Sequence, residues 1–341
     1  TLHLDRPHAG LTGTPFRPVL EAEPWQGRMR GTVSAFGFGG NNAHVVVDAL
    51  PEPGWSPAAA LPAARVVVVA LGARVGRAED APALQAAMAA GGGLLEGGEA
   101  RAPRVRLDLE GLRFPPRDLE RSLPQQTMIL AAAREAVGSL AAPLPRESTA
   151  IWIGMETDPE VARYGLRWRM ESRARTWQAP PGWATAAREA VVPMLDSAAV
   201  LGTMPNIPAN RLNSQLDLGG PSHVLAGGAA SGLLALDLAE RALRAGEIEA
   251  AVIGAVDLCC EPVHRAALGE AAAGDAAVVL VLMREELALS RGEQILARLD
   301  SPGEPARLRL GTAPGCLDLA GLCGDTGAAA GALHLAAAVL A

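Results

Sequence analysis

Four short runs of mostly apolar residues punctuate the chain. They are RVVVVAL from Arg65, AIWIG from Ala150, AAVIGAVDL from Ala250 and AAVVLVLM from Ala276. Each run is continuous rather than alternating, which is typical of strands that are buried on both faces of a sheet. The pattern therefore predicts four buried strands, with helices needed on both sides to cover them.

Helical patterns lie between these runs, at residues 81–90, 125–137 and 233–245. The third is preceded by a short strand at 222–225, and Gly246 follows it where the glycine that ends a helix belongs. Glu240 and Arg244 have the favourable spacing and order for an ion pair along this helix. Residues 156–206 are mixed in pattern. The alternation of buried strands with helices predicts a layered α/β fold.

Residues 1–63 follow a different pattern. Strands are predicted at 30–35 and 44–50, joined by a loop that is too rich in glycine to be regular. Residues 51–63, PEPGWSPAAALPA, have no apolar face and read as a stiff Pro/Ala linker. We therefore expect a domain boundary here, between residues 1–50 and residues 64–341.

Composition excludes several classes of function. The chain has 341 residues, of which 49% are hydrophobic, so a large core can form and disorder of the whole chain is excluded. The net charge of −7 argues against a general nucleic-acid binder. All 30 basic residues are arginine, which excludes a lysine Schiff base and a Walker-type phosphate loop.

The cellular setting follows from cysteine and hydropathy. The four cysteines form no disulfide framework, which favours a reducing compartment. No stretch is both long and apolar enough to span a bilayer, and the N-terminus does not resemble a signal peptide. We expect a cytoplasmic protein that contacts neither membrane nor nucleic acid.

Residues 222–245 are predicted to form a strand, a tight turn and a helix, and we call the turn between this strand and this helix the elbow. An α/β fold can present a nucleophile at such a turn. The helix N-terminus supplies backbone N–H groups and positive potential, and Gly227 and Gly228 permit the turn. The most exposed position carries Ala229, whose methyl group cannot attack a thioester. Ser231 lies two residues further on, and no motif places a histidine to activate it. The turn is predicted to lack a nucleophile.

Several longer motifs resemble the ketoacyl synthase, or condensing-enzyme, family. They are IPANR from Ile207, LDLGGPS from Leu216, ALDLA from Ala235, GDAAVVLVL from Gly274, GDTGAAAG from Gly324 and SAFGFGGNNAH from Ser34. The resemblance implies a thiolase-like fold, layered α-β-α-β-α. The last motif is similar to the C-terminal signature of the family, yet it lies near the start of this chain. The resemblance therefore implies that residues 64–341 are truncated before their final strands.

The departures from the family pattern concern its catalytic residues. The catalytic cysteine of the family falls on Ala229, its second catalytic histidine on Asp325 and its helix lysine on Ala337. Its first catalytic histidine has no counterpart, because the stretch between Leu299 and Gly321 is too short. The resemblance thus implies a domain with no catalytic residues.

The order of the motifs suggests two pieces of a longer chain. Residues 1–50 resemble the tail of an upstream ketosynthase, and residues 64–341 resemble a second ketosynthase without a nucleophile. This arrangement is similar to the ketosynthase–chain-length-factor pair of multidomain polyunsaturated-fatty-acid and polyketide synthases. It implies a partner that packs against the active ketosynthase around the elbow strand and shapes its acyl tunnel. Leu233, Leu236 and Leu243 should support the core beside that tunnel.

The resemblance also implies partners and substrates. The partners are the upstream ketosynthase and an acyl carrier protein, whose phosphopantetheine carries the substrates of fatty-acid or polyketide synthesis. No bound cofactor and no metal are expected. The alternative is a catalytic β-ketoacyl synthase, an acyltransferase of decarboxylative Claisen condensation, with the activity in the upstream unit. A binding module with a new ligand in a vestigial pocket is a third possibility, so whether this chain is an enzyme stays open.

The resemblance assigns roles to two further sets of residues. One set lines and gates the acyl site of the upstream unit: Phe36, Gly37, Phe38, Gly39, Gly40 and Asn41. The other possibility for these residues is a plain strand connection. Their spacing is not that of a dinucleotide-binding loop.

A basic cluster includes Arg163, Arg167 and Arg169. The favoured interpretation is a solvated or dimer-contact segment, and the functional alternative is docking of an acidic acyl carrier protein.

One cluster of cysteine and histidine residues is weighed as a metal site and rejected. Cys259, Cys260 and His264 are close in sequence, but adjacent cysteines are poor joint ligands and these follow a buried strand. We expect plain core thiols. His223, on the strand that enters the elbow, is interpreted as a packed or hydrogen-bonded interface residue.

Overall fold

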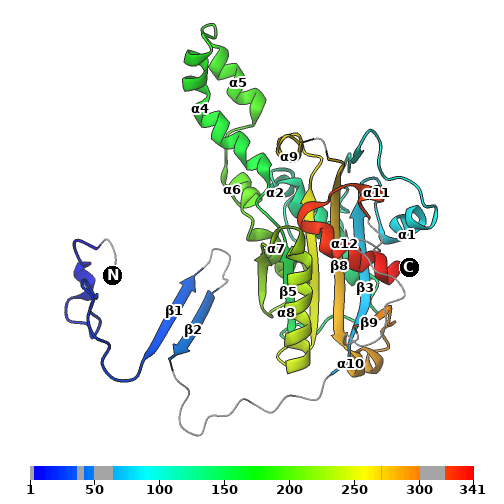
Figure 1. The fold of residues 1–341 in the computed structure, drawn as a ribbon, viewed down its shortest axis with the longest axis horizontal. Helices are drawn as coiled ribbons and strands as arrows, with labels where there is room; N and C mark the ends of the chain where they lie inside the picture. The colour runs from blue at the N-terminus through cyan, green and yellow to red at the C-terminus, as the bar shows by residue number, and fades with distance from the viewer. Residues whose placement is uncertain (1–3, 37–41, 50–63, 270, 300–318) are drawn as a thin grey trace. The chain divides into compact units, whose positions relative to one another are not determined.

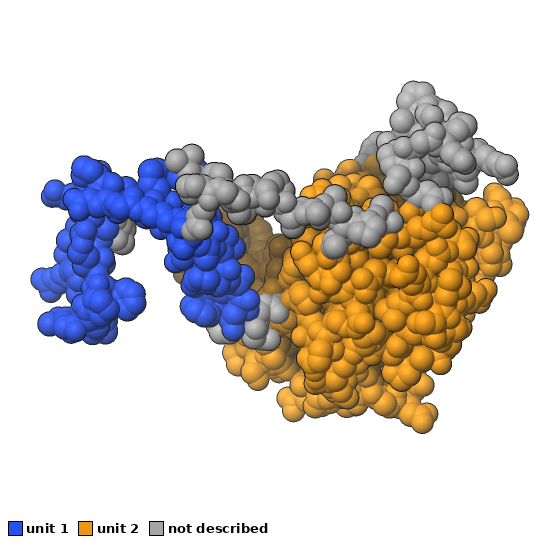
Figure 2. Space-filling model, turned by 90° about the horizontal axis from the view of Figure 1, so that it is seen from below, with its two compact units in different colours: residues 1–59 blue, residues 60–341 orange. Residues whose placement is uncertain are grey.

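The computed structural model describes residues 4–36, 42–49, 64–269, 271–299 and 319–341. The chain divides into two compact units, Thr1–Ala59 and Ala60–Ala341 (Figure 2). The division falls inside the segment that the sequence marks as a linker.

The first unit contains a short 3₁₀ turn, η1 (Ala9–Leu11), and a β-hairpin of β1 (Arg30–Phe36) and β2 (Asn42–Asp48). The strands are antiparallel, with Arg30 opposite Asp48, and the two side chains form an ion pair of 2.8 Å. The predicted second strand is displaced by two residues. Of the residues assigned to a gating loop, only Phe36 is described, and it is exposed; Gly37, Phe38, Gly39, Gly40 and Asn41 lie outside the described residues.

The second unit is built on a seven-stranded sheet with the strand order β6-β5-β7-β8-β3-β9 and β4 beside β8 (Figure 1). The strands are β3 (Val66–Val75), β4 (Glu99–Ala100), β5 (Thr149–Gly154), β6 (Ser222–Leu225), β7 (Ala250–Leu258), β8 (Ala273–Arg284) and β9 (Ala297–Leu299). β6, β5 and β7 are parallel, whereas β8 runs antiparallel to β7 and β3. All four strands expected from apolar runs are present.

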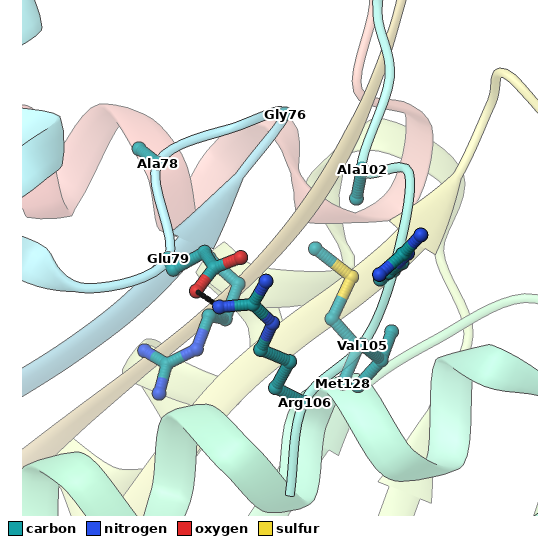
Figure 3. Close-up of a pocket in the computed structure, with 9 residues that line it drawn as sticks. Gly76, Ala78, Glu79, Ala102, Val105, Arg106 and Met128 are labelled. Carbon is teal, nitrogen blue, oxygen red and sulfur yellow. Dashed lines mark hydrogen bonds and ion pairs between the residues drawn. The ribbon is translucent and has the colours of Figure 1, made fainter.

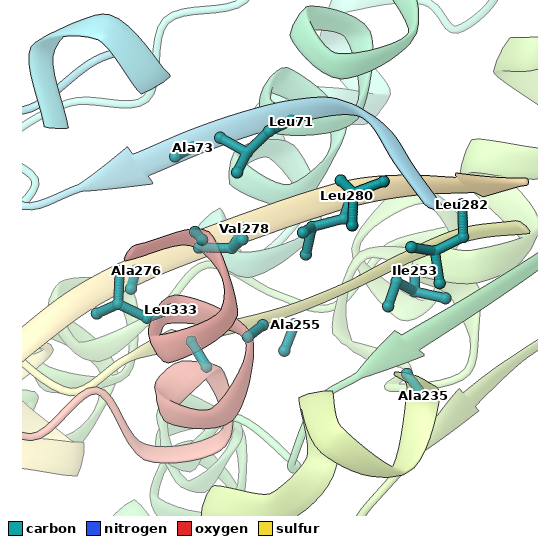
Figure 4. Close-up of a cluster of buried hydrophobic side chains, with 14 of the residues drawn as sticks. Leu71, Ala73, Ala235, Ile253, Ala255, Ala276, Val278, Leu280, Leu282 and Leu333 are labelled. Atoms are coloured by element: carbon teal, nitrogen blue, oxygen red, sulfur yellow. The ribbon is translucent and has the colours of Figure 1, made fainter. Parts of the chain in front are cut away.

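The continuous apolar runs are explained by burial of both sheet faces. Leu280 and Leu282 of β8 share a cluster with α1 (Ala81–Ala89), α8 (Ser231–Ala245) and α12 (Ala330–Leu340) (Figure 4). Val279 and Val281, which alternate with them, pack with α3 (Pro124–Gly138) and α7 (Ile207–Leu216). The described residues of the second unit therefore form a helix–sheet–helix sandwich.

The Arg-rich part of the mixed segment is helical. It forms α4 (Ala162–Thr176), which is followed by α5 (Trp183–Val191). The rings of Trp177 and Trp183 pack edge to face where the two helices are joined, with 5.7 Å between the ring centroids. The remaining short helices are α2 (Pro116–Glu120), α6 (Ser197–Thr203), α9 (Pro262–Leu268), α10 (Glu285–Ser290) and α11 (Ala320–Cys323). Among the described residues, none of the helices has the length and hydropathy needed to cross a bilayer.

Candidate functional site

The predicted strand–turn–helix is present at the carboxyl end of β6, beside the carboxyl ends of the parallel strands β5 and β7. β6 ends at Leu225, a 3₁₀ turn η3 occupies Gly228–Ala230, and α8 begins at Ser231, two residues before the predicted start. Gly228 has a φ of 57°, in the left-handed region that favours glycine. Ala229 lies in this turn and is exposed, so the position for a nucleophile is formed but carries a methyl group.

The hydroxyl of Ser231 is used to close the turn. The side chain is fully buried, its Oγ donates to the carbonyl oxygen of Gly228 at 2.7 Å, and it accepts from the N–H of Gly227 at 2.9 Å. Since the hydroxyl proton and an acceptor site are both engaged within the turn, Ser231 does not offer a free nucleophile in place of the missing thiol.

A carboxylate also occupies the turn. Glu156 follows β5, the parallel neighbour of β6, and its Oε1 accepts from the N–H of Gly228 at 2.7 Å. A negative charge at this N–H opposes both a thiolate and a developing oxyanion. Sequence reasoning missed Glu156 because 72 residues separate it from Gly228, and only the pairing of β5 with β6 brings them together.

The start of α12 packs against the elbow. A Cβ on Gly232 would lie 2.7 Å from the backbone nitrogen of Ala332, and a Cβ on Gly331 would lie 3.2 Å from the carbonyl oxygen of Ala229. Asp325, where the second histidine of the family falls, is exposed and its Oδ1 accepts from the N–H of Gly327 at 2.8 Å.

Ala337, at the position of the helix lysine, is a buried core residue. Its helix is also lined by buried alanines, so this position contributes packing only. In the described residues, neither Asp325 nor Ala337 supplies a proton donor to the elbow.

The helix after the turn is amphipathic, as predicted. Leu243 is fully buried and Leu236 packs against the same cluster, but Leu233 is 45% exposed beside the elbow, so its expected place in the core is wrong. Glu240 and Arg244 form the expected ion pair at 2.6 Å, and Gly246 ends the helix with a φ of 73°.

His223 on β6 is held by its neighbour on β5. The indole N–H of Trp152 donates to Nδ1 of His223 at 3.2 Å, and burial lowers the pKa of the imidazole. The histidine is therefore neutral and hydrogen-bonded at neutral pH. The interpretation of His223 as a packed or hydrogen-bonded residue is confirmed, whereas its place at an interface stays a prediction.

The arginine cluster is largely committed within the chain. Arg163 forms an ion pair with Glu261 at 2.5 Å, and Arg167 donates to the carbonyl oxygens of Arg188 and Val192 at 2.7 and 2.9 Å. Arg169 is exposed on α4. Carrier-protein docking stays a prediction, for which Arg169 is the best placed of the three.

A second group of chemically active side chains lies at the end of β7. Asp257 and Cys259 are buried, His264 at α9 is half-buried, and one ligand atom of each lies within 4.8 Å of the others. Cys260 points elsewhere, since its Sγ donates to the carbonyl oxygen of Ala273 at 3.3 Å. Sequence reasoning weighed the two cysteines with His264 and expected plain core thiols. In the structure Asp257, near the end of β7, joins Cys259 and His264 in place of Cys260.

Burial dominates the electrostatics of this second group. It raises the pKa of the carboxyl groups of Asp257 and Asp275 and of the Cys259 thiol, and it raises the pKa of Cys260 to about 12. Both thiols are therefore protonated at neutral pH in the metal-free chain.

A small cleft of about 90 Å³ lies where β3 ends (Figure 3). Arg74, Arg104 and Arg106 line it, but Arg106 pairs with Glu79 at 3.4 Å and Arg74 pairs with Glu135. Two of the three guanidinium groups are thus already neutralised by carboxylates.

The fold and the elbow together define a condensing-enzyme class of domain. Residues 101–277 match the family described as Beta-ketoacyl synthase, N-terminal domain. The chain belongs to the β-ketoacyl synthase family.

Relatives in the family are parts of much longer proteins. A polyunsaturated fatty acid synthase of Thraustochytrium sp. is 27% identical over 292 residues, which are 71% of this chain and 13% of that protein. The 6-methylsalicylic acid synthase of Aspergillus niger is 28% identical over 206 residues, 54% of this chain and 10% of that protein. The chain thus spans a small share of the curated relatives it matches.

Solved structures show the same fold. The PfaC Keto synthase-Chain length factor matches with a TM-score of 0.64 and 19% identity, covering 81% of this chain and 35% of that one. The ishigamide ketosynthase/chain length factor matches with a TM-score of 0.51 and 18% identity, covering 69% and 65%. The expected thiolase-like α/β fold is confirmed, but of the five expected layers the described residues form three, one sheet between two layers of helices.

Proposed function

We propose that residues 64–341 are a non-catalytic ketosynthase homologue of the chain-length-factor type, which pairs with an active β-ketoacyl synthase and shapes its acyl tunnel. The observation that carries this proposal is the methyl group of Ala229 on an otherwise complete elbow. Glu156 at the N–H of Gly228 and the engaged hydroxyl of Ser231 support it, because the hydroxyl is not free to attack and the N–H of Gly228 already holds a carboxylate.

In this proposal the contribution of the domain is steric. Residues 1–50 are the tail of the upstream ketosynthase, residues 51–63 are the linker, and the loop from Phe36 to Asn41 gates the acyl site of that upstream enzyme. The substrates are acyl groups carried on the phosphopantetheine of an acyl carrier protein in the cytoplasm. The two relatives named above, one a polyunsaturated fatty acid synthase and one a 6-methylsalicylic acid synthase, support a place in fatty-acid or polyketide synthesis.

The edge of the sheet supports the pairing. β6 is the terminal strand, and the carbonyl oxygens of Pro221 and Leu225 accept from Ile151 and Met155 of the β5 side. Because N–H and C=O groups alternate in direction along a strand, the N–H of Val224 points to the open edge. An open edge is a template for a strand of another chain.

An apolar hollow supports the pairing as well. About 460 Å³ lies between α4 and α5, lined by Tyr164, Trp168, Met194 and Leu195 among others. Trp168 is 86% exposed and Met194 is 71% exposed, and apolar surface of this kind is typical of interaction sites.

Covalent labelling tests the absence of a nucleophile. We expect an acyl-thioester or cerulenin-like probe to leave the chain unmodified, as measured by intact mass and peptide mapping, while an active ketosynthase treated in parallel is fully labelled. The Ser231→Ala variant serves as the matched control. An adduct on Ser231 that the variant lacks, or condensation of two acyl groups by the purified chain, would contradict the proposal.

A backbone change in β6 tests the pairing. Val224→Pro removes the N–H that faces the open edge without removing a bond to β5, so the fold should survive. We expect the complex with the upstream ketosynthase to weaken at least about tenfold by analytical ultracentrifugation, because one strand-edge bond is lost and the ring obstructs further pairing. Val224→Thr, which keeps the N–H, should bind like the parent chain. Equal binding by both variants would place the interface elsewhere.

A further inference from the structure

The group at the end of β7 has the composition of a transition-metal site. A thiol, an imidazole and a carboxylate, from Cys259, His264 and Asp257, are the ligand types that Zn²⁺ takes in proteins. Nδ1 of His264 lies 3.4 Å from Oδ1 of Asp257. With Zn–ligand bonds of about 2.0–2.3 Å, two ligands of a tetrahedral ion lie roughly 3.3–3.8 Å apart. The imidazole and the carboxylate therefore already have the separation that such an ion requires.

Two hydrogen bonds hold the carboxylate of Asp257 in place. Oδ1 of Asp257 accepts from Nε2 of Gln125 at 3.3 Å, and Oδ2 accepts from the N–H of Ala328 at 2.9 Å. Metal-ligating carboxylates are oriented by outer partners of this kind. Nδ1 of His264 lies 3.2 Å from the carbonyl oxygen of Leu258 in the metal-free chain, a contact that a metal ion bound at Nδ1 would replace.

The surroundings have polar oxygens without partners. Gln125 is 1% exposed and its amide nitrogen contacts Asp257, yet its Oε1 has no hydrogen-bond partner among the described residues. Asp158, 3% exposed, also has an unpartnered Oδ2 among these residues and lies close enough to be repelled by the charge of Asp257. Buried oxygens without partners are costly, and a bound cation with its water molecules satisfies them.

The local charge favours a cation. Asp158, Asp257, Glu160 and Glu261 meet here, and among the described residues Arg163 is the guanidinium that pairs with this group, through Glu160 and Glu261. A divalent ion would offset the remaining negative charge at a place where water cannot screen it well.

We infer that Asp257, Cys259 and His264 form a binding site for a divalent transition-metal ion of the zinc type, with a fourth position left for water. Its three ligands lie outside the strand–turn–helix of residues 222–245, and the inference does not depend on the proposed pairing function. On binding, the S–H bond of Cys259 breaks, a sulfur–metal bond forms and the proton goes to solvent. The ion takes the place of the proton that Nδ1 of His264 shares with Asp257, and that proton moves to Nε2. The site ties the end of β7 to α9 and to the turn before α12.

Cobalt titration of the full 341-residue chain tests the inference. Co²⁺ reports tetrahedral coordination by its visible bands and a thiolate ligand by a charge-transfer band in the near ultraviolet. We expect one Co²⁺ per chain, a charge-transfer band, one proton released per ion in weak buffer, and displacement by Zn²⁺. Uptake of no ion by the folded chain would overturn the inference.

Two variants assign ligands and a third is the control, each checked for an unchanged circular dichroism spectrum. Cys259→Ser should lose the charge-transfer band, whereas Cys323→Ser, which removes an equally buried thiol of α11, should keep it. His264→Gln, at a half-buried position, should weaken Co²⁺ binding by at least about 10–100-fold, the loss that a change of an outer partner alone already causes. A band that survives in Cys259→Ser, or binding that is unchanged in His264→Gln, would place the ion on other residues and refute the assignment.

Discussion

Replacing Gly72 by alanine is expected to lower the free energy of unfolding by about 3 kcal/mol, because the new methyl group has no room. Gly72 lies in the middle of β3, where α3 crosses the sheet. A Cβ built there lies 2.1 Å from the carbonyl oxygen of Ala132 and 2.9 Å from the nitrogen of Ala136. Both atoms belong to the backbone of a buried helix, so no side chain can rotate away. Either the helix is displaced from the sheet or the strand is distorted.

Urea denaturation of the variant and the parent chain measures this loss. Gly165→Ala is the matched control, since Gly165 lies inside α4 with no atom of the described residues within 4 Å of the new Cβ. There the substitution is expected to stabilise the chain by about 0.5–1 kcal/mol, through the better helix propensity of alanine. If the two variants were equally stable, the close contact of α3 with β3 would not exist in solution.

Asp158→Asn is expected to stabilise the chain at pH 8, by up to about 3 kcal/mol. Burial raises the pKa of the Asp158 carboxyl to about 6 from its usual 3.8, with repulsion from Glu160, Glu261 and Asp257 acting in the same direction. The folded chain therefore holds this proton at a pH where the unfolded chain has lost it. Stability from this group is full below about pH 4 and falls as the pH rises to about 6.

The asparagine keeps the useful contact and removes the charge. Oδ1 of Asp158 accepts from the N–H of Glu160 at 2.8 Å, and an amide oxygen can do the same. The stabilisation should appear between pH 4 and 6, remain constant above, and vanish at pH 4, as measured by denaturation with a chelator present.

Asp196→Asn is the matched control with the opposite sign. Asp196 caps α6 through the N–H of Ala199 and pairs with Arg121, and these contacts lower the pKa of its carboxyl. Its replacement should destabilise the chain at neutral pH and lose that effect as the pH falls below about 4. A flat pH response in both variants would contradict the two assignments.

The strands could be predicted because both of their faces are buried. The valines and leucines from Ala276 to Met283 alternate between two helix layers, so no polar residue interrupts them and the run is visible in the sequence. The mixed segment at α4 gave no such signal. Most of that helix is exposed, with Met170 as its buried residue, so polar side chains occupy nearly every face.

The elbow and its missing nucleophile were predictable as local features, whereas the distant groups that meet the elbow were not. Strand, glycine turn and helix are consecutive in sequence, so Ala229 could be placed directly. Glu156 is far in sequence from Gly228, and Gln125 is far in sequence from its partner Asp257. Glu156 reaches Gly228 only because β5 pairs with β6, and Gln125 reaches Asp257 across 132 residues.

The sequence by itself determined the layered α/β class, the family resemblance and the loss of the nucleophile, because each rests on the identity of neighbouring residues. The tertiary structure decided which distant groups meet: the carboxylate at the elbow, the buried hydroxyl of Ser231, and the Asp257, Cys259 and His264 cluster. Those meetings depend on strand order and on helix packing, which spacing along the chain does not specify.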